Sequence, residues 1–294
     1  LCVIKQLCPK VNSTKRWENA CRRFAQEAKI LAKLGSHSQV PMLLDYFEGE
    51  GELYLVQEYI HGWTLAREVK RNGTKTEAQV KQFLRELLPI LQYLYENQVI
   101  HRDIKPLNLL RCADDQRIVL IDFGAVKENL MDVGNDSLHP IMNTNFVGTM
   151  GFAPPEQLSL RPVYASDIYA LGMTCVYLLT GKTPLEMEND SQTGEISWYK
   201  YVKVSDSFAH VLNKMLKFSL NERFQKPSDV ARALRVESDI PHLSNCLTTQ
   251  PMKNKLPQKI DTAQEYISPV ARTAIAIREW KAKLKTKHPQ SPLS

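Results

Sequence analysis

One polar stretch in the middle of the chain constrains its fold more than any other feature. Residues 101–108 read HRDIKPLN, which fits the pattern H-R-D-x-K-x-x-N. The triplet DFG begins nineteen residues after Asp103, and PPE follows it at 154–156. A single triplet occurs by chance in many chains, but three such stretches in this order and at these spacings are a strong signal.

Together the three stretches resemble the catalytic loop, the metal-binding D-F-G motif and the A-P-E end of the activation segment in a eukaryotic-type protein kinase. CVIKQL at 2–7, FAPPEQ at 152–157 and YASDIYALG at 164–172 look like bacterial Hanks-type Ser/Thr kinases, those of cyanobacteria in particular. The resemblance implies an α+β, two-lobed protein kinase-like fold with a small β-rich N-lobe and a large, mainly α-helical C-lobe. We expect the N-lobe and hinge at 1–60, the C-lobe at 61–237, and a linker with a basic tail at 238–294.

The resemblance implies transfer of the γ-phosphate of ATP to Ser or Thr hydroxyls of proteins. Phosphoryl transfer leaves a protein little covalent chemistry, so positioned charges must carry the reaction. Asp103 is then the catalytic base, and Lys105 lies near the transferred phosphoryl group. Asn108 and Asp122 are expected to hold Mg²⁺, which prefers hard oxygen ligands. Taken alone, each Asp or Asn could instead have a structural role and cap a helix or form a turn.

The first residues resemble the V-A-I-K strand, which makes Lys5 the contact to the α- and β-phosphates. The alternative is a surface lysine on an edge strand. A helix is expected at 16–34, and its Glu27 matches the αC glutamate that pairs with the strand lysine. Glu27 could equally form a solvated surface pair with Lys29.

Only four residues precede Lys5, which leaves no room for a G-x-G-x-x-G loop, and Leu1 is not Met. We therefore expect an N-terminally shortened kinase with a truncated N-lobe. A kinase-fold scaffold without turnover is one alternative, and intact Lys5, Glu27 and Asp103 speak against it. A small-molecule phosphotransferase is another, which the GTMGF stretch at 148–152 and PPE disfavour because such enzymes lack a peptide-docking segment.

Residues 52–60 are expected to form a strand that runs into the interlobe hinge. By resemblance, Gln57 lies behind the adenine pocket, and Glu58 and Ile60 offer a backbone C=O and N–H to adenine. The alternative is an edge hairpin without a ligand. Helices are expected at 64–71, 77–97, 207–217 and 227–237, and the second of them has a wide apolar face typical of core packing.

The activation segment is expected to span residues 122–156. The stretch GTMGF resembles a G-T-x-G-Y docking loop, so Thr149 is expected to bond Asp103 and Lys105, a pairing that favours Ser/Thr over Tyr specificity. We expect Thr144 to be the activating phosphorylation site, with Arg102 as the residue that receives the phosphate.

Three further residues are expected to be structural. Glu156 and Arg223 match a buried ion pair that ties the activation segment to the lower lobe. Asp167 is expected near the start of a central buried helix, and His101 is expected to brace the catalytic loop.

The charge distribution argues against nucleic acid as the main ligand. The net charge is +6, and residues 249–294 supply all of it with nine Lys/Arg against three Asp/Glu. The other 248 residues balance 29 basic against 29 acidic groups. The six cysteines are scattered without a C-x-x-C pair, which suits a reducing, cytoplasmic location. The apolar run at 169–180 is shorter than the about 20 residues that span a bilayer, so it predicts a buried core helix.

A basic amphipathic helix is expected at 269–287 in the tail, where apolar residues recur at gaps of 4, 3, 3 and 4 from Val270 to Leu284. Such a basic amphipathic helix is typical of contact with an anionic membrane surface or a partner groove. The alternative is a helix packed on the domain or a stub before a further module.

Overall fold

The computed structural model describes residues 1–8, 14–35, 37–49, 51–128 and 148–243. The chain divides into two compact units, Leu1–Cys246 and Leu247–Ser294, and every described residue lies in the first. Thr144 and the segment at 269–287 lie outside the described residues, so the predictions made for them stay predictions.

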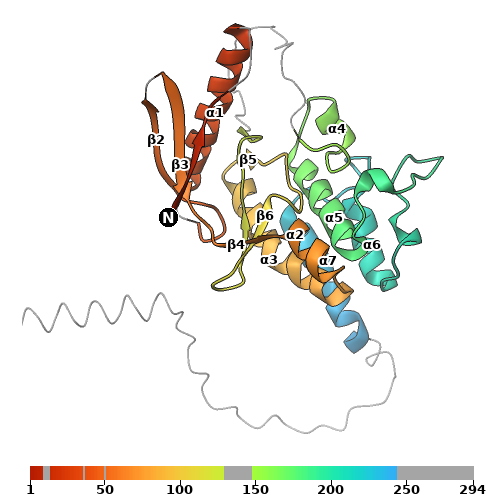
Figure 1. The fold of residues 1–294 in the computed structure, drawn as a ribbon. Coiled ribbons are helices and arrows are strands. Elements are labelled where there is room, and N and C mark those ends of the chain that lie inside the picture. Colours follow the sequence, from red (N-terminus) through yellow and green to blue (C-terminus); the bar gives the residue numbers. More distant parts are fainter. Residues whose placement is uncertain (9–13, 36, 50, 129–147, 244–294) are drawn as a thin grey trace, which may run out of the picture. The chain divides into compact units, whose positions relative to one another are not determined.

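A three-stranded antiparallel sheet forms the beginning of the chain (Figure 1). Its strands are β1 (Cys2–Gln6), β2 (Leu43–Gly49) and β3 (Glu52–Glu58), in the order β1-β3-β2. In β1, exposed and half-buried residues alternate, which places Val3 and Lys5 on the same face. The strand expected at 52–60 ends two residues earlier, at Glu58.

Helix α1 (Thr14–Leu34) packs against β2 and β3. Its buried residues recur at helical spacing and are Phe24, Glu27, Ala28, Ile30, Leu31 and Leu34. Glu27 is therefore on the buried face of the helix, where its Oε1 pairs with Lys5.

The second part of the fold is mainly helical (Figure 1). It contains α2 (Leu65–Asn72), α3 (Glu77–Glu96), α5 (Tyr164–Thr180), α6 (Asp206–Met215) and α7 (Pro227–Leu243). The wide apolar face expected on α3 is buried, as predicted, and includes Val80, Phe83, Leu84, Leu87, Leu88, Leu91 and Leu94. Every residue of α5 from Ala165 to Val176 is buried, which confirms the predicted core helix.

One helix end in this part differs from the sequence-based expectation by several residues. Helix α7 continues to Leu243, beyond the expected end at 237. The intervening sequence ESDI at 237–240 contains no Gly or Pro, so nothing local stops the helix there.

Short strands frame the stretch at 101–108. Strand β5 (Val99–Ile100) precedes it and pairs with β8 (Lys127–Glu128). Strand β6 (Leu109–Cys112) follows it and lies between β4 (Gly62–Thr64) and β7 (Ile118–Leu120). The polar loop is therefore anchored at both ends by antiparallel pairing. The remaining elements are α4 (Pro155–Leu158) and the 3₁₀ turns η1 (Pro184–Glu186) and η2 (Trp198–Lys200).

Specific contacts join the end of α1 to the helical part. The Gln39 side-chain amide donates to the Glu86 and Ile118 carbonyls at 3.0 Å each. The rings of His37 and Tyr93 stack with centroids 4.5 Å apart. These contacts hold α1, and with it Glu27, in a defined place relative to the strand that leads into Asp122.

No helix in the described part of the chain is both long and apolar enough to cross a bilayer. The five cysteines that the structure describes are all free thiols.

Candidate active site

The loop that begins at His101 is held by one buried carboxylate. Asp167, in the first turn of α5, accepts the backbone N–H groups of His101 and Arg102 at 2.8 Å each. Arg102 has a φ of 67°, a conformation that L-residues seldom adopt. The two hydrogen bonds stabilise this turn. Burial raises the pKa of Asp167 to about 6, against the opposing effect of the two N–H groups.

His101 is fully buried and packs edge-on against Phe123, with ring centroids 4.9 Å apart. Its Nδ1 accepts the backbone N–H of Asp103 at 3.3 Å. Burial lowers the pKa of His101 to about 4, although the Asp103 and Asp122 carboxylates oppose the shift. The ring is therefore neutral at pH 7. It packs against Phe123 of the DFG triplet and accepts a hydrogen bond from within its own loop.

Asp103 is the centre of a hydrogen-bond network. Its Oδ2 lies 2.8 Å from Lys105 Nζ and 2.9 Å from Asn108 Nδ2. Its Oδ1 accepts from the Thr149 hydroxyl at 2.8 Å, and Lys105 Nζ lies 2.6 Å from the same hydroxyl oxygen. A second bond from Asn108 Nδ2 to the Asp103 carbonyl, at 2.9 Å, fixes the asparagine side chain. Thr149 thus meets Asp103 and Lys105 at this site, although it follows them by 46 and 44 positions in the sequence.

A second cluster joins β1, α1 and the DFG triplet. Lys5 Nζ lies 2.5 Å from Glu27 Oε1 and 3.4 Å from Asp122 Oδ1. Burial alone would lower the pKa of Lys5, but the two carboxylates outweigh it and the pKa is raised. Burial would likewise raise the pKa of Asp122, but Lys5 and the Gly124 N–H outweigh it and the pKa is lowered. Lys5 is therefore a cation and Asp122 an anion at pH 7.

Gly124 is close to both carboxylates of this cluster. A Cβ at this position would lie 3.2 Å from Glu27 Oε2 and 3.3 Å from Asp122 Oδ1. Those separations are tighter than ordinary van der Waals contacts, so a side chain here would push against two carboxylates. The absence of a side chain allows the DFG triplet to approach α1.

The Arg102 side chain binds the backbone just after the DFG triplet. Its Nε donates to the Ala125 carbonyl, and its Nη2 donates to the Val126 carbonyl at 3.0 Å. Burial lowers the pKa of Arg102, while Asp167 opposes the shift. The sequence-based prediction for Arg102 was a phosphate contact, and its partner Thr144 lies outside the described residues, so that prediction remains open.

Glu156 and Arg223 form a bidentate ion pair with distances of 2.6 Å and 3.3 Å. The Arg223 side chain is fully buried, and it also donates to the carbonyls of Ala165, Lys217 and Phe218. These bonds satisfy the donors of a buried guanidinium. They join α4, the start of α5 and the loop before α7.

Two residues of this region were missed by sequence reasoning. Gln157 Nε2 donates to the Arg102 carbonyl at 2.5 Å, and its side chain is buried. Ser166 donates its hydroxyl to Glu156 Oε1 at 2.9 Å. Both stand directly beside motif residues in the sequence, but a neutral polar residue next to a motif gives no pattern that separates it from a solvent-exposed one.

The residues expected at the hinge lie at and just after the end of β3. Gln57 is buried, and Glu58 N–H donates to the Met42 carbonyl at 2.9 Å. The Glu58 carboxylate accepts the Met42 N–H at 3.2 Å. The adenine contacts expected from Glu58 and Ile60 involve backbone groups and stay predictions.

The oxygen donors at this site suit a hard cation. Asn108 uses its Nδ2 for two bonds to Asp103, which leaves its amide oxygen as an acceptor. The Asp122 carboxylate is half-exposed and ionised. An amide oxygen and a carboxylate fit Mg²⁺ when ATP phosphates and water complete its shell. Among the described residues there is no group of three or more His, Cys, Asp or Glu side chains that would hold a metal by itself.

Comparison with known proteins identifies the family. The model of the protein kinase domain matches residues 1–234, which is most of the chain. The chain therefore belongs to the protein kinase family, and the two-part architecture described above is the kinase fold.

The most similar relatives found include cyanobacterial kinases. The chain is 53% identical over 238 residues to serine/threonine-protein kinase B of Synechocystis sp., which covers 80% of this chain and 42% of that protein. It is 41% identical to serine/threonine-protein kinase PknA of Nostoc sp., again over 80% of this chain and 42% of the relative. Mouse Aurora kinase C is 30% identical over 68% of this chain and 71% of its own length. The chain thus spans less than half the length of these two cyanobacterial relatives.

Proposed function

We propose that this chain is an ATP-dependent protein Ser/Thr kinase, which transfers the γ-phosphoryl group of ATP to a serine or threonine hydroxyl of a protein. The network around Asp103 carries the proposal, because it gathers the acid–base and phosphate-directed groups that the reaction needs at one carboxylate. The cyanobacterial relatives, which bear the name serine/threonine-protein kinase, support the same function.

Asp103 accepts the proton of the substrate hydroxyl in this proposal. An ionised carboxylate has about four lone-pair positions. Lys105, Asn108 and Thr149 occupy three of them, two on Oδ2 and one on Oδ1. The remaining position on Oδ1 accepts the hydroxyl of the protein substrate. The three bonds hold the carboxylate in one orientation, so the carboxylate loses no further conformational entropy when the substrate binds.

Lys105 and Lys5 direct the negatively charged groups of ATP. Lys105 places an ammonium beside Asp103, where the transferred group meets the substrate oxygen. Lys5 contacts the α- and β-phosphates and is positioned by Glu27. Glu58 and Ile60 hold adenine through their backbone groups. Together these contacts align the phosphoryl group with the substrate hydroxyl that attacks it.

Asn108 and Asp122 hold the divalent cation, which we propose to be Mg²⁺. When bound, the cation neutralises charge on the phosphate oxygens. The half-exposed Asp122 side chain and the amide oxygen of Asn108 are the groups of this chain that reach it. Protonation of Asp122 would remove its charge, and its lowered pKa keeps it ionised through the neutral range.

The other residues of the site hold its parts together. Asp167 fixes the turn at Arg102, and the Glu156–Arg223 pair ties the end of the activation segment to the helical lobe. We propose that phosphate on Thr144 binds Arg102. In that event Arg102 must release the Ala125 and Val126 carbonyls, or share its donors with them.

The test is phosphate transfer by this 294-residue chain with Mg·ATP and a protein mixture, followed by identification of the phosphorylated residues. We expect phosphoserine and phosphothreonine with the chain, and a loss of about 10²–10⁴-fold with Asp103→Asn. Asp114→Asn, a change of the same chemistry at an exposed carboxylate, should leave the rate unchanged. A chain that binds Mg·ATP but transfers nothing would instead support the scaffold alternative.

A second arm separates protein from small-molecule substrates. The same labelled ATP is offered with a panel of small alcohols and amino sugars, and the products are separated by thin-layer chromatography. Transfer to the small alcohols with none to protein would contradict the proposal. Transfer to protein alone supports it.

A further inference from the structure

Two arginines share one aromatic ring on the outside of the helical lobe. Arg67 and Arg71 are one turn apart on α2, so their side chains leave the same face. The Cζ atom of Arg67 lies 3.3 Å from the centroid of the Trp63 ring, and that of Arg71 lies 5.2 Å from it. A guanidinium that stacks on an aromatic face is oriented before any ligand binds, while its N–H groups still point outward.

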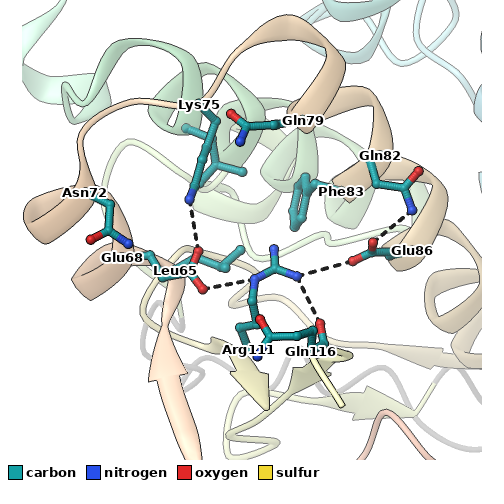
Figure 2. A pocket seen from close by; sticks show the side chains of 11 residues that line it. Leu65, Glu68, Asn72, Lys75, Gln79, Gln82, Phe83, Glu86, Arg111 and Gln116 are labelled. Atoms are coloured by element: carbon teal, nitrogen blue, oxygen red, sulfur yellow. Dashed lines mark hydrogen bonds and ion pairs between the residues drawn. The ribbon is translucent and has the colours of Figure 1, made fainter. Parts of the chain in front are cut away.

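A cavity of about 340 Å³ opens beside this ring. It is lined by Trp63, Arg67, Glu68, Arg71 and Asn72. Glu68 is the one carboxylate in that lining, and it is engaged elsewhere. Its two oxygens lie 2.9 Å from Arg111 Nε and 3.2 Å from Lys75 Nζ, as Figure 2 shows.

Arg67 and Arg71 are therefore cations without a carboxylate partner anywhere in the described part of the chain. The basic residues paired with acidic groups beside this site are Lys75 and Arg111, and their acidic partners are Glu68 and Glu86. Arg67 and Arg71 therefore add an excess of two positive charges, in a part of the sequence whose total charge is balanced. Such a local excess in a concave site attracts an anionic group.

The site is connected to the loop that carries Asp103. The Ala66 N–H, in the first turn of α2, donates to the Pro106 carbonyl at 3.1 Å. Trp63 is in β4 and is paired with Arg111 in β6, the strand that follows this loop. A ligand held by Arg67 and Arg71 is therefore on α2, which is bonded directly to the catalytic loop.

We propose that Trp63, Arg67 and Arg71 form a recognition site for an acidic segment of the protein substrate. This inference rests on the protein kinase function proposed above and names a class of substrate for it. Glutamate and aspartate carboxylates pair with guanidinium groups in bidentate geometry. A cavity of about 340 Å³ can accept peptide side chains, whereas a bilayer presents a flat surface. The balanced charge of the catalytic region disfavours nucleic acid.

The direct test is equilibrium binding measured by fluorescence anisotropy. The probes are a labelled dodecapeptide with four consecutive glutamates and the same peptide with four glutamines. We expect the glutamate peptide alone to bind, and Arg67→Ala/Arg71→Ala to weaken its binding about tenfold. Lys70→Ala is the matched control for Arg71→Ala, because it removes one charge from the same helix at a residue outside the cavity lining. It should change binding less than about twofold.

The variant Trp63→Leu tests whether binding needs the two arginines stacked on the ring or only their positive charge. It keeps every charge but removes the ring on which both guanidiniums stack, so we expect weaker binding of the glutamate peptide. Equal binding of the two peptides, or equal losses in Lys70→Ala and Arg71→Ala, would overturn the inference. So would tighter, Arg67-dependent binding of a single-stranded oligonucleotide or of phosphatidylserine vesicles.

Failure of this inference is distinguishable from failure of the proposed function. Peptide binding needs neither ATP nor turnover, and it is measured in parallel on the Asp103→Asn variant. A chain that transfers phosphate but binds the two peptides equally overturns only the recognition site. In transfer assays with a serine peptide that carries the acidic segment, Arg67→Ala/Arg71→Ala should raise KM and leave kcat unchanged.

Discussion

The carboxylate of Asp167 accepts the backbone N–H of Arg102 at 2.8 Å, and Arg102 has a φ of 67°. An unusual backbone conformation next to Asp103 is thus stabilised by a side chain 65 positions further along the chain. The same carboxylate accepts the His101 N–H, so one buried group satisfies two donors of the loop. Loop geometry and the start of α5 are therefore coupled.

Asp167→Asn should destabilise the protein by about 1–3 kcal/mol, because the amide nitrogen cannot accept one of the two N–H groups and leaves it buried without a partner. Urea unfolding at pH 7.5 measures the change. Asp229→Asn is the control, since the Asp229 carboxylate pairs with the exposed Arg232 three residues on. Equal stability of the two variants would mean that the turn at Arg102 does not depend on Asp167.

His101 should make the protein less stable in acid. Its pKa is about 4 in the fold and 6.5 when unfolded, so the unfolded chain takes up the proton first as the pH falls. Stability is lost between pH 6.5 and 4, by about 2 kcal/mol at pH 5 relative to pH 7.5. The raised pKa of Asp167 acts in the opposite sense, but it is present in wild type and variant alike.

The measurement compares urea unfolding of wild type and His101→Asn at pH 7.5 and pH 5. The variant starts less stable because it loses packing against Phe123, so the quantity of interest is the change with pH and not the starting value. We expect wild type to lose about 2 kcal/mol more than the variant. Parallel losses would show that His101 titrates normally in the folded protein.

The burial of α3 and α5 was the feature of the fold most readily predicted from the sequence. The apolar face of α3 repeats at helical spacing, and the run that becomes α5 is apolar on all sides. Both patterns depend only on residues that are close together in the sequence, so they can be recognised without knowing which elements the helices pack against. The end of α7 was placed six residues too early, because Pro241 and the polar residues that follow it are typical of a linker.

The spacing of the motifs identified the residues around Asp103, but it did not predict all the hydrogen bonds that hold them in place. Thr149 was expected to contact Asp103 and Lys105, and the two contacts are present. The bonds from Gln157 to the Arg102 carbonyl and from Arg102 to Ala125 and Val126 were not expected. They run between a side chain and a distant backbone carbonyl, and any residue supplies a carbonyl, so the sequence carries no trace of the partner.

Removal of one member of the Glu156–Arg223 pair should be costly. Glu156→Ala leaves the fully buried Arg223 without its charge partner, and we expect a loss of about 3–5 kcal/mol in urea unfolding. Glu156→Ala/Arg223→Met should lose less than the sum of the two single changes, because no buried charge remains. The exposed pair Lys200–Glu188 provides the control, and Lys200→Ala should be close to wild type. Additive losses in the double variant would contradict this account.

The Thr149 hydroxyl should matter for transfer and not for stability. It donates to Asp103 Oδ1 at 2.8 Å and lies 2.6 Å from Lys105 Nζ, so it holds two groups that the proposed mechanism uses. Thr149→Val keeps the shape but removes both bonds, and we expect kcat to fall about 10-fold to 100-fold. Thr149→Ser keeps the hydroxyl and should recover most of the rate. Unfolding by urea should be similar for all three proteins. A valine variant with wild-type kcat, or a serine variant as slow as the valine one, would show that the hydroxyl does not position Asp103 for catalysis.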